Sequence, residues 1–539
     1  TMKFSVRILI VIMLTAGLAI LLAQPRHQYK KNPTNGMAMI VDGQYDQALN
    51  HFDAQFNEYA EDFQVYHDVY PVDLEALYGK AVAYTSQGKL DSAFKYVKLS
   101  VDSGLPPARY LAGPRELLSP LYEYPRFQIF IQGFDIQLVH GPLLGKVTSN
   151  SASFWVRTVE EVTVQVIANA IGQSGGDILS AHTKTDAAND FTGRITLDDL
   201  RPNTTYQYEL IVDGVKLSQT WEFTTAPVVN APAQFEIGFG GGAGFTPWYE
   251  RMWNTIAAHD LDAFLLLGDN VYIDHPEYPS VQRYCYYRRQ SRPEYRNFAA
   301  RTPVYSIWDD HDFTVNDGWG GPAIDEPAWK IPVWEVFKQN WNNPAYGGGE
   351  EQPGCWFDFT KGDVHFIILD GRYYRENPNE DEPSMLGPAQ KKWLFETLRE
   401  SDATFKVLAS PVPWAKNTKP GSPDTWDGYA GEREEIFTFL EENEIEGVVL
   451  ISADRHRSDV WKITRPDGYD FYEFESSKLT NVHTHDPMPD ALFSYNDKCS
   501  FGKLLFNTTG TDPYVLYQIY SIDNELIHTF RVNRSQLSL

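Results

Sequence analysis

Three short stretches of the chain, GDNVY, WDDHD and ADRH, carry the side chains best suited to chemistry. Each follows directly on a run of apolar residues that predicts a β-strand. Carboxylate, phenol and imidazole groups bind metal ions or transfer protons. Because ligands gather at the carboxyl ends of strands in open α/β sheets, the three stretches predict one shared polar site.

The first stretch places Asp269 and Tyr272 on one tight loop. A carboxylate and a phenolate in this arrangement can hold a hard cation such as ferric iron. A turn capped by the Asp269 side chain is the structural alternative, and this stretch alone does not separate the two.

The second stretch contains Asp309, Asp310, His311 and Asp312 in consecutive positions. Adjacent carboxylates repel one another, so such a loop is unfavourable unless a cation or hydrogen bonds compensate. The ordinary pKa of histidine lies near neutrality, which suits His311 to contact a phosphate oxygen or to protonate a leaving group. We therefore interpret this loop as functional.

The third stretch separates Asp454 and His456 by one residue just after a strand, a recurrent arrangement of metal ligands. Arg455 and Arg457 beside them can bind an anionic substrate through paired hydrogen bonds. Surface salt bridges are the alternative for both arginines.

The elements that must position these loops alternate between strands and helices over residues 234–539. Helical patterns run from Gln390 to Arg399 and from Glu432 to Glu442. This alternation predicts an α/β domain. The predicted strands are FEIGF, DAFLLL, PVYSIW, VHFIIL, FKVLA and EGVVLIS.

Residues 138–228 change to short strands with turn residues between them, which predicts an all-β sandwich. The LRPNTTYQYEL phrase resembles a fibronectin type III domain. We expect Tyr206 and Trp155 to be core residues. The sandwich would position its neighbours rather than bind a ligand.

Residues 36–134 have a helical pattern in which the phrase GQYDQA recurs as GKLDSA 45 residues later. This resembles tetratricopeptide repeats, with residues 65–71 inserted between helices. An ordinary helical cap packed on its neighbour is the alternative. A repeat-like segment would also offer a surface to a protein partner.

The net charge of −26 disfavours contact with nucleic acid, so we expect no nucleic-acid scaffold as a partner. Three scattered cysteines, Cys285, Cys355 and Cys499, exclude a disulfide-dense framework. One disulfide with one thiol and three separate thiols are both compatible with the sequence.

The first residues of the chain have the pattern of an export signal. Lys3 and Arg7 precede an uninterrupted apolar run over residues 8–23. Residues 1–24 are therefore predicted to be a signal peptide or, if uncleaved, a membrane anchor. We expect an exported protein that is periplasmic, secreted or anchored facing outward.

Together with the three loops, the phrases LDGRYYR, SPVPWA, WDGYAGEREEI and EFESSKLT make residues 234–539 similar to the PhoD-like alkaline phosphatases of the calcineurin-like metallophosphoesterase superfamily. The resemblance implies two sheets flanked by helices and a two-metal centre, with iron and calcium or with zinc or manganese. The implied reaction is attack of metal-bound hydroxide on the phosphorus of a phosphomonoester or phosphodiester, in a small molecule or a polymer.

On this resemblance, Asp269 would bridge the two metals and Tyr272 would bind ferric iron. Asp310 would hold the second metal and act in catalysis, with Asn316 a further ligand from the matching stretch. His311 would be the catalytic histidine.

Asp454 and His456 would complete the implied metal cluster, and Arg455 would meet the substrate. One feature departs from the family. Where the family has a Ser-Cys pair that supplies a thiolate ligand, this chain has Gly241 and Gly242. Glycine can let backbone amides approach an anion, but it cannot replace a thiolate.

The sequence thus supports two hypotheses. The first is an exported, metal-dependent phosphoester hydrolase built from a helical segment, a β-sandwich and an α/β domain. The second is a catalytically degenerate relative that acts as an extracytoplasmic binding or scaffold protein. The vacant ligand position at Gly242 motivates the second.

Overall fold

The computed structural model describes residues 32–62, 72–172, 176–466 and 468–539. The predicted export segment, residues 1–24, and the predicted insertion, residues 65–71, lie outside the described residues. Across the described ranges, no helix is both long enough and apolar enough to span a bilayer.

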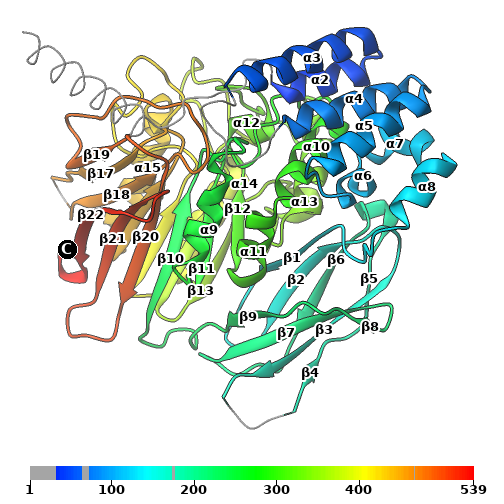
Figure 1. The fold of residues 1–539 in the computed structure, drawn as a ribbon. Coiled ribbons are helices and arrows are strands. Elements are labelled where there is room, and N and C mark those ends of the chain that lie inside the picture. The colour runs from blue at the N-terminus through cyan, green and yellow to red at the C-terminus, as the bar shows by residue number, and fades with distance from the viewer. Residues whose placement is uncertain (1–31, 63–71, 173–175, 467) are drawn as a thin grey trace, which may run out of the picture.

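The first region is helical, and its two copies of the sequence phrase form two similar helical hairpins (Figure 1). Gly43 and Gly88 take matching left-handed conformations in the two hairpin turns, with φ of 73° and 74°. Glycine adopts this conformation without strain, which explains why it recurs there. The helices are α2 (Pro33–Val41), α3 (Tyr45–Asp62), α4 (Leu74–Ser86), α5 (Leu90–Asp102), α6 (Ala108–Ala112), α7 (Arg115–Tyr122) and α8 (Pro125–Ile131).

The second region contains two facing sheets, as the strand pattern predicts. One sheet has the order β1-β2-β6, and the other has the order β4-β3-β7-β8, with β5 beside β3 and β9 beside β7. The strands are β1 (His140–Gly145), β2 (Ala152–Arg157), β3 (Thr163–Ala170), β4 (Ile178–Leu179), β5 (Thr183–Lys184), β6 (Thr192–Leu197), β7 (Thr205–Val212), β8 (Val215–Lys216) and β9 (Trp221–Thr224).

The two predicted core residues of this region have different surroundings. Tyr206 belongs to the core of the sandwich, and its hydroxyl accepts a hydrogen bond from the Arg201 backbone N–H at 2.9 Å. Trp155 is buried, but it packs into the larger core shared with the following domain, and its indole N–H donates to the Gln339 carbonyl at 2.9 Å. The sandwich is therefore joined to its neighbour through an apolar contact.

The third region is built on two stacked sheets. The first has the order β12-β11-β10-β20-β21-β22 and the second has the order β13-β14-β15-β16-β18-β17-β19. Phe366 of the second sheet packs on Phe506 of the first, with ring centroids 5.7 Å apart. The central strands are buried along their whole length, which is the pattern of parallel strands covered on both faces.

These strands are β10 (Gln234–Gly240), β11 (Ala263–Leu267), β12 (Val304–Ile307), β13 (Phe357–Lys361), β14 (Val364–Ile368), β15 (Phe405–Ala409), β16 (Val448–Ser452), β17 (Ser458–Ile463), β18 (Phe471–Ser476), β19 (Phe493–Tyr495), β20 (Ser500–Asn507), β21 (Tyr514–Ser521) and β22 (Leu526–Asn533). All six strands predicted from the sequence of this region are confirmed.

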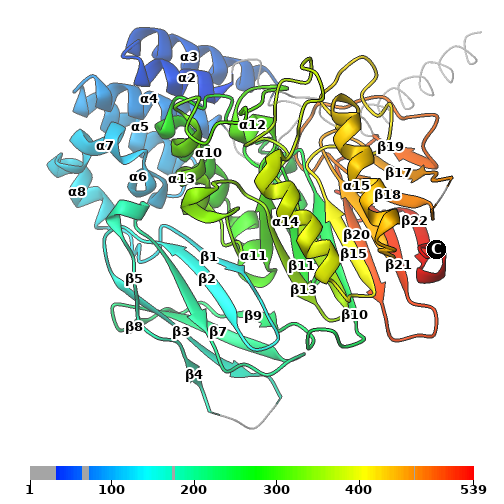
Figure 2. The ribbon, with the colours of Figure 1, turned by 180° about the vertical axis from the view of Figure 1, so that it is seen from behind.

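The helices of the third region include the two predicted from the sequence, now α14 and α15, which lie on the side seen in Figure 2. Short helical turns at 249–251, 349–351, 426–429 and 534–536 join the elements. The helices are α9 (Met252–Ala257), α10 (Pro279–Gln290), α11 (Pro293–Arg301), α12 (Asp310–Phe313), α13 (Lys330–Asn340), α14 (Gly387–Glu400) and α15 (Ala430–Glu442).

A buried polar cluster, here called the Arg157 hub, joins the sandwich to the α/β domain. The fully buried guanidinium donates to Gln290 Oε1 at 2.7 Å and to Asn340 Oδ1 at 2.9 Å, and it pairs with Asp190 at 2.9 Å. It also lies 2.7 Å from His140 Nδ1. The charge in this hub is thus balanced by one carboxylate and several neutral acceptors.

Helix α10 contacts both N-terminal regions. The Tyr284 hydroxyl donates to Glu75 of the helical segment at 2.7 Å. The Tyr287 hydroxyl donates to Asp190 of the sandwich at 2.5 Å. Helix α10 therefore anchors both regions to the α/β domain.

The cysteines are three separate buried thiols, Cys285, Cys355 and Cys499. The alternative that the sequence left open, one disulfide with one thiol, is not what the structure contains.

Candidate metal centre and catalytic cavity

The first of the three loops follows β11 and approaches the second loop closely. Gly268 has φ of 99°, and a Cβ added there would lie 2.8 Å from the backbone nitrogen of Asp309. Only glycine allows this approach. The next residue, Asp269, is buried, and so the two loops present their carboxylates to one another.

Asp312 holds the first loop in place. Its carboxylate accepts hydrogen bonds from the backbone N–H groups of Asn270 at 2.7 Å and Val271 at 2.9 Å. Asp312 therefore has a structural role, although it stands beside the functional candidates in the sequence.

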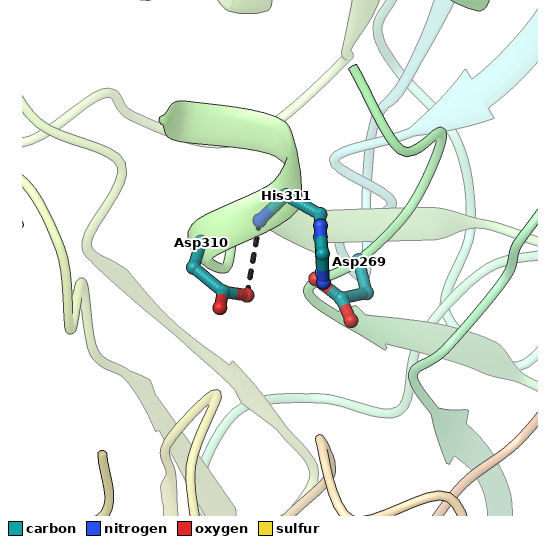
Figure 3. A group of neighbouring side chains, drawn as sticks. All are labelled: Asp269, Asp310 and His311. Atoms are coloured by element: carbon teal, nitrogen blue, oxygen red, sulfur yellow. Dashed lines mark hydrogen bonds between the residues drawn. The ribbon is translucent and has the colours of Figure 1, made fainter. Parts of the chain in front are cut away.

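Three of the predicted ligands, Asp269, Asp310 and Asp454, fall in two groups that share Asp269. Oxygen and ring-nitrogen atoms of Asp269, Asp310 and His311 lie within 4.8 Å of one another (Figure 3). The same limit holds for the carboxylates of Asp269, Asp309 and Asp454. Asp269 therefore belongs to both groups. Asp309 is a member of the second group, although the sequence analysis did not name it as a ligand.

The atoms in these groups fit a bound cation. Asp269 Oδ1 and Asp309 Oδ2 are buried, and neither has a hydrogen-bond partner among the described residues. Burial, together with the neighbouring carboxylates, raises the pKa of Asp269 well above its ordinary value. Unpaired carboxylate oxygens at such a site are unfavourable in the absence of a positive charge, and hard metal ions prefer oxygen ligands.

A third acidic group, Asp310, Asp317 and Asp424, already has its own counter-charges. Asp424 Oδ2 accepts a hydrogen bond from Lys419 at 2.8 Å, and Asp424 Oδ1 accepts one from Arg372 at 2.8 Å. This group is therefore an ion-pair network that supports the second loop.

Arg372, from the LDGRYYR phrase, links that network to the candidate metal centre. Its side chain is fully buried and pairs with Asp309 through Nε. Its Nη2 lies 3.9 Å from Asp310 Oδ1. The guanidinium thus fixes the two adjacent carboxylates of the second loop and offsets part of their repulsion.

His311 has a partner that the sequence analysis did not single out. Its Nδ1 lies 2.6 Å from Asp274 Oδ1, on the first loop five residues after Asp269. Burial alone would lower the pKa of His311, but Asp310, Asp269 and Asp274 raise it well above its ordinary value. Because Asp274 contacts Nδ1, the imidazole is oriented so that Nε2 is the nitrogen suited to donate a proton.

Tyr272 and His456 contact each other within the same site. The Tyr272 hydroxyl and His456 Nε2 are 3.0 Å apart, and the Tyr272 ring stacks on His311 with centroids 4.6 Å apart. His456 Nδ1 lies 3.1 Å from the His483 carbonyl. Burial lowers the pKa of His456 well below its ordinary value, so its imidazole is neutral, as a metal ligand must be.

Five residues of the site, none of them glycine, have left-handed backbone conformations: Asp269, Tyr272, Asp274, Asp454 and His456, with φ between 52° and 71°. Side chains rarely adopt this conformation, and such strain is concentrated at functional sites. The backbone thus supports a functional interpretation of these loops independently of the side-chain types.

The structure gives a reason for glycine at position 242. Gly242 has φ of 64°, and an added Cβ would lie 2.8 Å from the Ser477 hydroxyl and 3.4 Å from the His456 ring. A thiolate side chain would thus need both a strained backbone and a shift of Ser477. The thiolate ligand that the family has after β10 is therefore absent, and Ser477 and His456 occupy part of the space it would need.

The remaining predicted residues lie at the edge of the centre. Arg455 Nη1 is 3.3 Å from Asp454 Oδ2, so Arg455 contacts a predicted ligand. Asn316 is exposed and lines a cavity beside the centre, together with His311, Tyr272 and His456. This cavity has a volume of about 370 Å³.

Residues 237–498, which contain all three loops of the site, match the PhoD-like phosphatase family model. Residues 135–230 match a domain family of unknown function, DUF7800.

The chain is similar to alkaline phosphatase D of Bacillus subtilis (strain 168), with 28% identity over 320 residues. That match covers 49% of this chain and 53% of the relative, so the chain spans about half the length of the curated relative it matches.

Two solved structures share the fold. A structure of PhoD has a TM-score of 0.62 and 19% identity, and the match covers 73% of this chain and 89% of that one. Purple acid phosphatase PPD1 from yellow lupin (Lupinus luteus) has a TM-score of 0.53 and 13% identity, with 74% and 75% covered. At these identities the similarity concerns the fold.

Proposed function

We propose that this protein is a metal-dependent hydrolase of phosphoesters that acts outside the cytoplasm. The observation that carries the proposal is the position of Asp269 in two carboxylate groups, beside a cavity lined by His311. The long apolar run near the start of the chain supports export.

In this proposal Asp269, Asp309, Asp310 and Asp454 would hold two cations, which would be iron and calcium or another pair such as zinc or manganese. His456, whose Nε2 lies 3.0 Å from the Tyr272 hydroxyl, would complete the donor set. Tyr272 and Asn316 are the further candidate ligands. Bound metal ions would activate water and neutralise charge on the phosphoryl group.

The protein groups then divide the remaining work. Asp274 holds His311 through Nδ1, so that Nε2 can protonate the leaving oxygen. Arg372 keeps Asp309 and Asp310 fixed at the centre. Arg455, paired with Asp454, would meet the anionic substrate from the third loop.

The test is metal analysis of the purified protein, combined with hydrolysis of phenyl phosphate by the wild type and by His311→Ala. We expect bound metal in both proteins and a loss of about 10²–10⁴-fold in kcat for the variant, the usual contribution of a general acid. Undiminished activity in His311→Ala would remove the assignment of His311.

The second candidate is a binding protein without turnover, and the vacant ligand position at Gly242 favours it. It predicts a protein that is folded and binds a ligand or partner, but that releases no phosphate from any ester. Measurable turnover by metal-containing wild-type protein would eliminate it.

A further inference from the structure

The cavity beside the candidate metal centre is not formed by the α/β domain alone. Asn32 and Pro33, at the start of α2, line it together with His311, Tyr272 and Asn316. Pro33 is buried. The helical segment lies outside the region matched by the family model, which begins at residue 237. A region separate from the catalytic fold thus contributes to the wall of the catalytic cavity.

Two polar contacts hold α2 against the loop that carries the partner of His311. Asn35 Oδ1 lies 3.0 Å from His275 Nε2, and the Tyr278 hydroxyl donates to Asp42 Oδ1 at 2.8 Å. His275 directly follows Asp274, the residue that holds His311 Nδ1. The position of α2 is therefore coupled to the loop that orients the candidate acid.

Buried contacts further along the helical segment keep it in place. Tyr284 of α10 donates to Glu75 and stacks on Tyr78 with ring centroids 6.0 Å apart. Arg109, which is fully buried, donates to the Tyr284 carbonyl at 3.4 Å. Both Figure 1 and Figure 2 show the helical segment packed beside α10. The wall formed by Asn32 and Pro33 is consequently a fixed part of the folded protein.

We propose that α2 is the specificity-determining wall of the cavity, and that it restricts the substrate to phosphomonoesters of small polar alcohols. This inference rests on the proposed hydrolase function. If His311 protonates the leaving oxygen, the leaving alcohol must lie in the cavity that His311 shares with Asn32 and Pro33.

The size and lining of the cavity support this substrate class. Its volume of about 370 Å³ is at the lower end of the range for small-molecule sites. The side chains of Thr246, Asn316 and Asn481 bring hydroxyl and amide groups to it, which suit an alcohol with further hydrogen-bonding groups. An internal bond of a polymer would need a path for the chain on both sides of the phosphorus, and α2 occupies one side of this cavity.

The test loosens the wall without touching the metal centre. Asn35→Ala, Asp42→Ala and the double variant remove the two contacts to the His275 loop. Gln44→Ala, an exposed position of the same hairpin, is the matched control. The substrates are phenyl phosphate, the bulkier 4-methylumbelliferyl phosphate and the diester bis(4-nitrophenyl) phosphate.

We expect the wild type to prefer phenyl phosphate, and the double variant to reduce this preference over the bulkier monoester by about fivefold or more in kcat/KM, mainly through KM. The Ki of inorganic phosphate, which occupies only the phosphoryl position, should change by less than about twofold. Gln44→Ala should behave as the wild type.

An unchanged preference in folded variants, or a wild type that cleaves the diester as well as the small monoester, would overturn the role of α2 while leaving the hydrolase proposal intact. A wild type that contains metal but cleaves none of the three esters would overturn both. If the double variant fails to fold, the two single variants provide the same comparison.

Discussion

Two buried clusters of charged side chains in this protein have opposite character. In the Arg157 hub every guanidinium nitrogen has an acceptor, and Asp190 is the counter-charge. In the candidate metal centre, Asp269 Oδ1 and Asp309 Oδ2 are buried without a partner among the described residues. The residues that carry these contacts are largely buried in both clusters. The clusters differ in whether the polar side chains have hydrogen-bond partners within the protein.

This difference separates a structural cluster from a functional one. Buried polar groups are normally hydrogen-bonded, because an unpaired one loses its hydration without compensation. The candidate metal centre has carboxylate oxygens with no hydrogen-bond partner in the described structure, together with left-handed backbone conformations, and both lower the stability of the folded protein. Such a cluster is explained by a ligand that the isolated chain does not supply.

The largest effect should come from removing the shared carboxylate. Asp269→Asn should lower kcat/KM by about 10³-fold, since several kcal/mol of charge stabilisation at the reacting phosphoryl group would be lost. The same change should raise the melting temperature of the chelator-treated protein, because it removes one of the repelling carboxylates. Steady-state kinetics and calorimetry measure the two effects.

Asp312→Asn is the control in the same pair of loops. Asp312 accepts two backbone N–H groups, so its replacement should destabilise the protein by about 1–3 kcal/mol. A gain in stability from Asp269→Asn and a loss from Asp312→Asn would support the distinction between a functional and a structural carboxylate. Equal destabilisation by the two changes would contradict it.

The next effect concerns the Arg157 hub. Arg157→Met should reduce the free energy of unfolding by about 3–5 kcal/mol, because it leaves Asp190 without its counter-charge and the side-chain oxygens of Gln290 and Asn340 without this donor. Below the unfolding transition its kcat should match that of the wild type. Arg126→Met, which breaks an exposed pair with Asp91, should cause no measurable change.

Denaturant titration gives these stabilities. If Arg157→Met were as stable as the wild type, the Arg157 hub would not contribute to the stability of the protein.

The smallest effect is expected at Asp73, which is hydrogen-bonded like the residues of the Arg157 hub but, like Asp269, belongs to no ion pair in the described part of the chain. This buried carboxylate caps α4 and accepts from Gln55 Nε2 at 2.8 Å, but no cation pairs with it among the described residues. Burial raises its pKa to about 7. Between about pH 4 and pH 7 the folded protein therefore binds more protons at this site than the unfolded chain, so this contribution to stability falls as pH rises.

Asp73→Asn keeps the cap and removes the titration. We expect the variant to gain stability relative to the wild type, by about 4 kcal/mol at most, as the pH rises through this window. Melting temperatures of both proteins at several pH values measure the gain. A difference that does not depend on pH would show that Asp73 is ionised in the folded protein at no energetic penalty.

Local sequence patterns were sufficient for six strands of the α/β domain and for the three loops that follow β11, β12 and β16. An apolar run that ends in acidic residues is a local signal, and the parallel topology brings the ends of such runs together. Asp269, Asp310, His311 and Asp454 were found for this reason.

The residues that the sequence did not reveal depend on contacts across the fold. Asp274 lies in the first loop, but its role appears only because His311 lies 2.6 Å away. In the sequence, Asp309 is one of four adjacent polar residues. The structure shows that Asp309 lies beside Asp269, whereas Asp312 accepts hydrogen bonds from the backbone of the first loop. The two residues can be told apart only once the first loop is seen to approach the second. The pairing of α2 with the His275 loop joins residues 240 positions apart.

The contacts of helix α10 restrict how the three regions of this protein could be exchanged during evolution. One of its tyrosines is bonded to the helical segment and another to the sandwich, and Gln290 at its end belongs to the Arg157 hub. Exchange of either N-terminal region for that of another protein by recombination would expose buried polar groups on a single helix. The three regions are therefore expected to be inherited together and to accumulate compensating substitutions along α10.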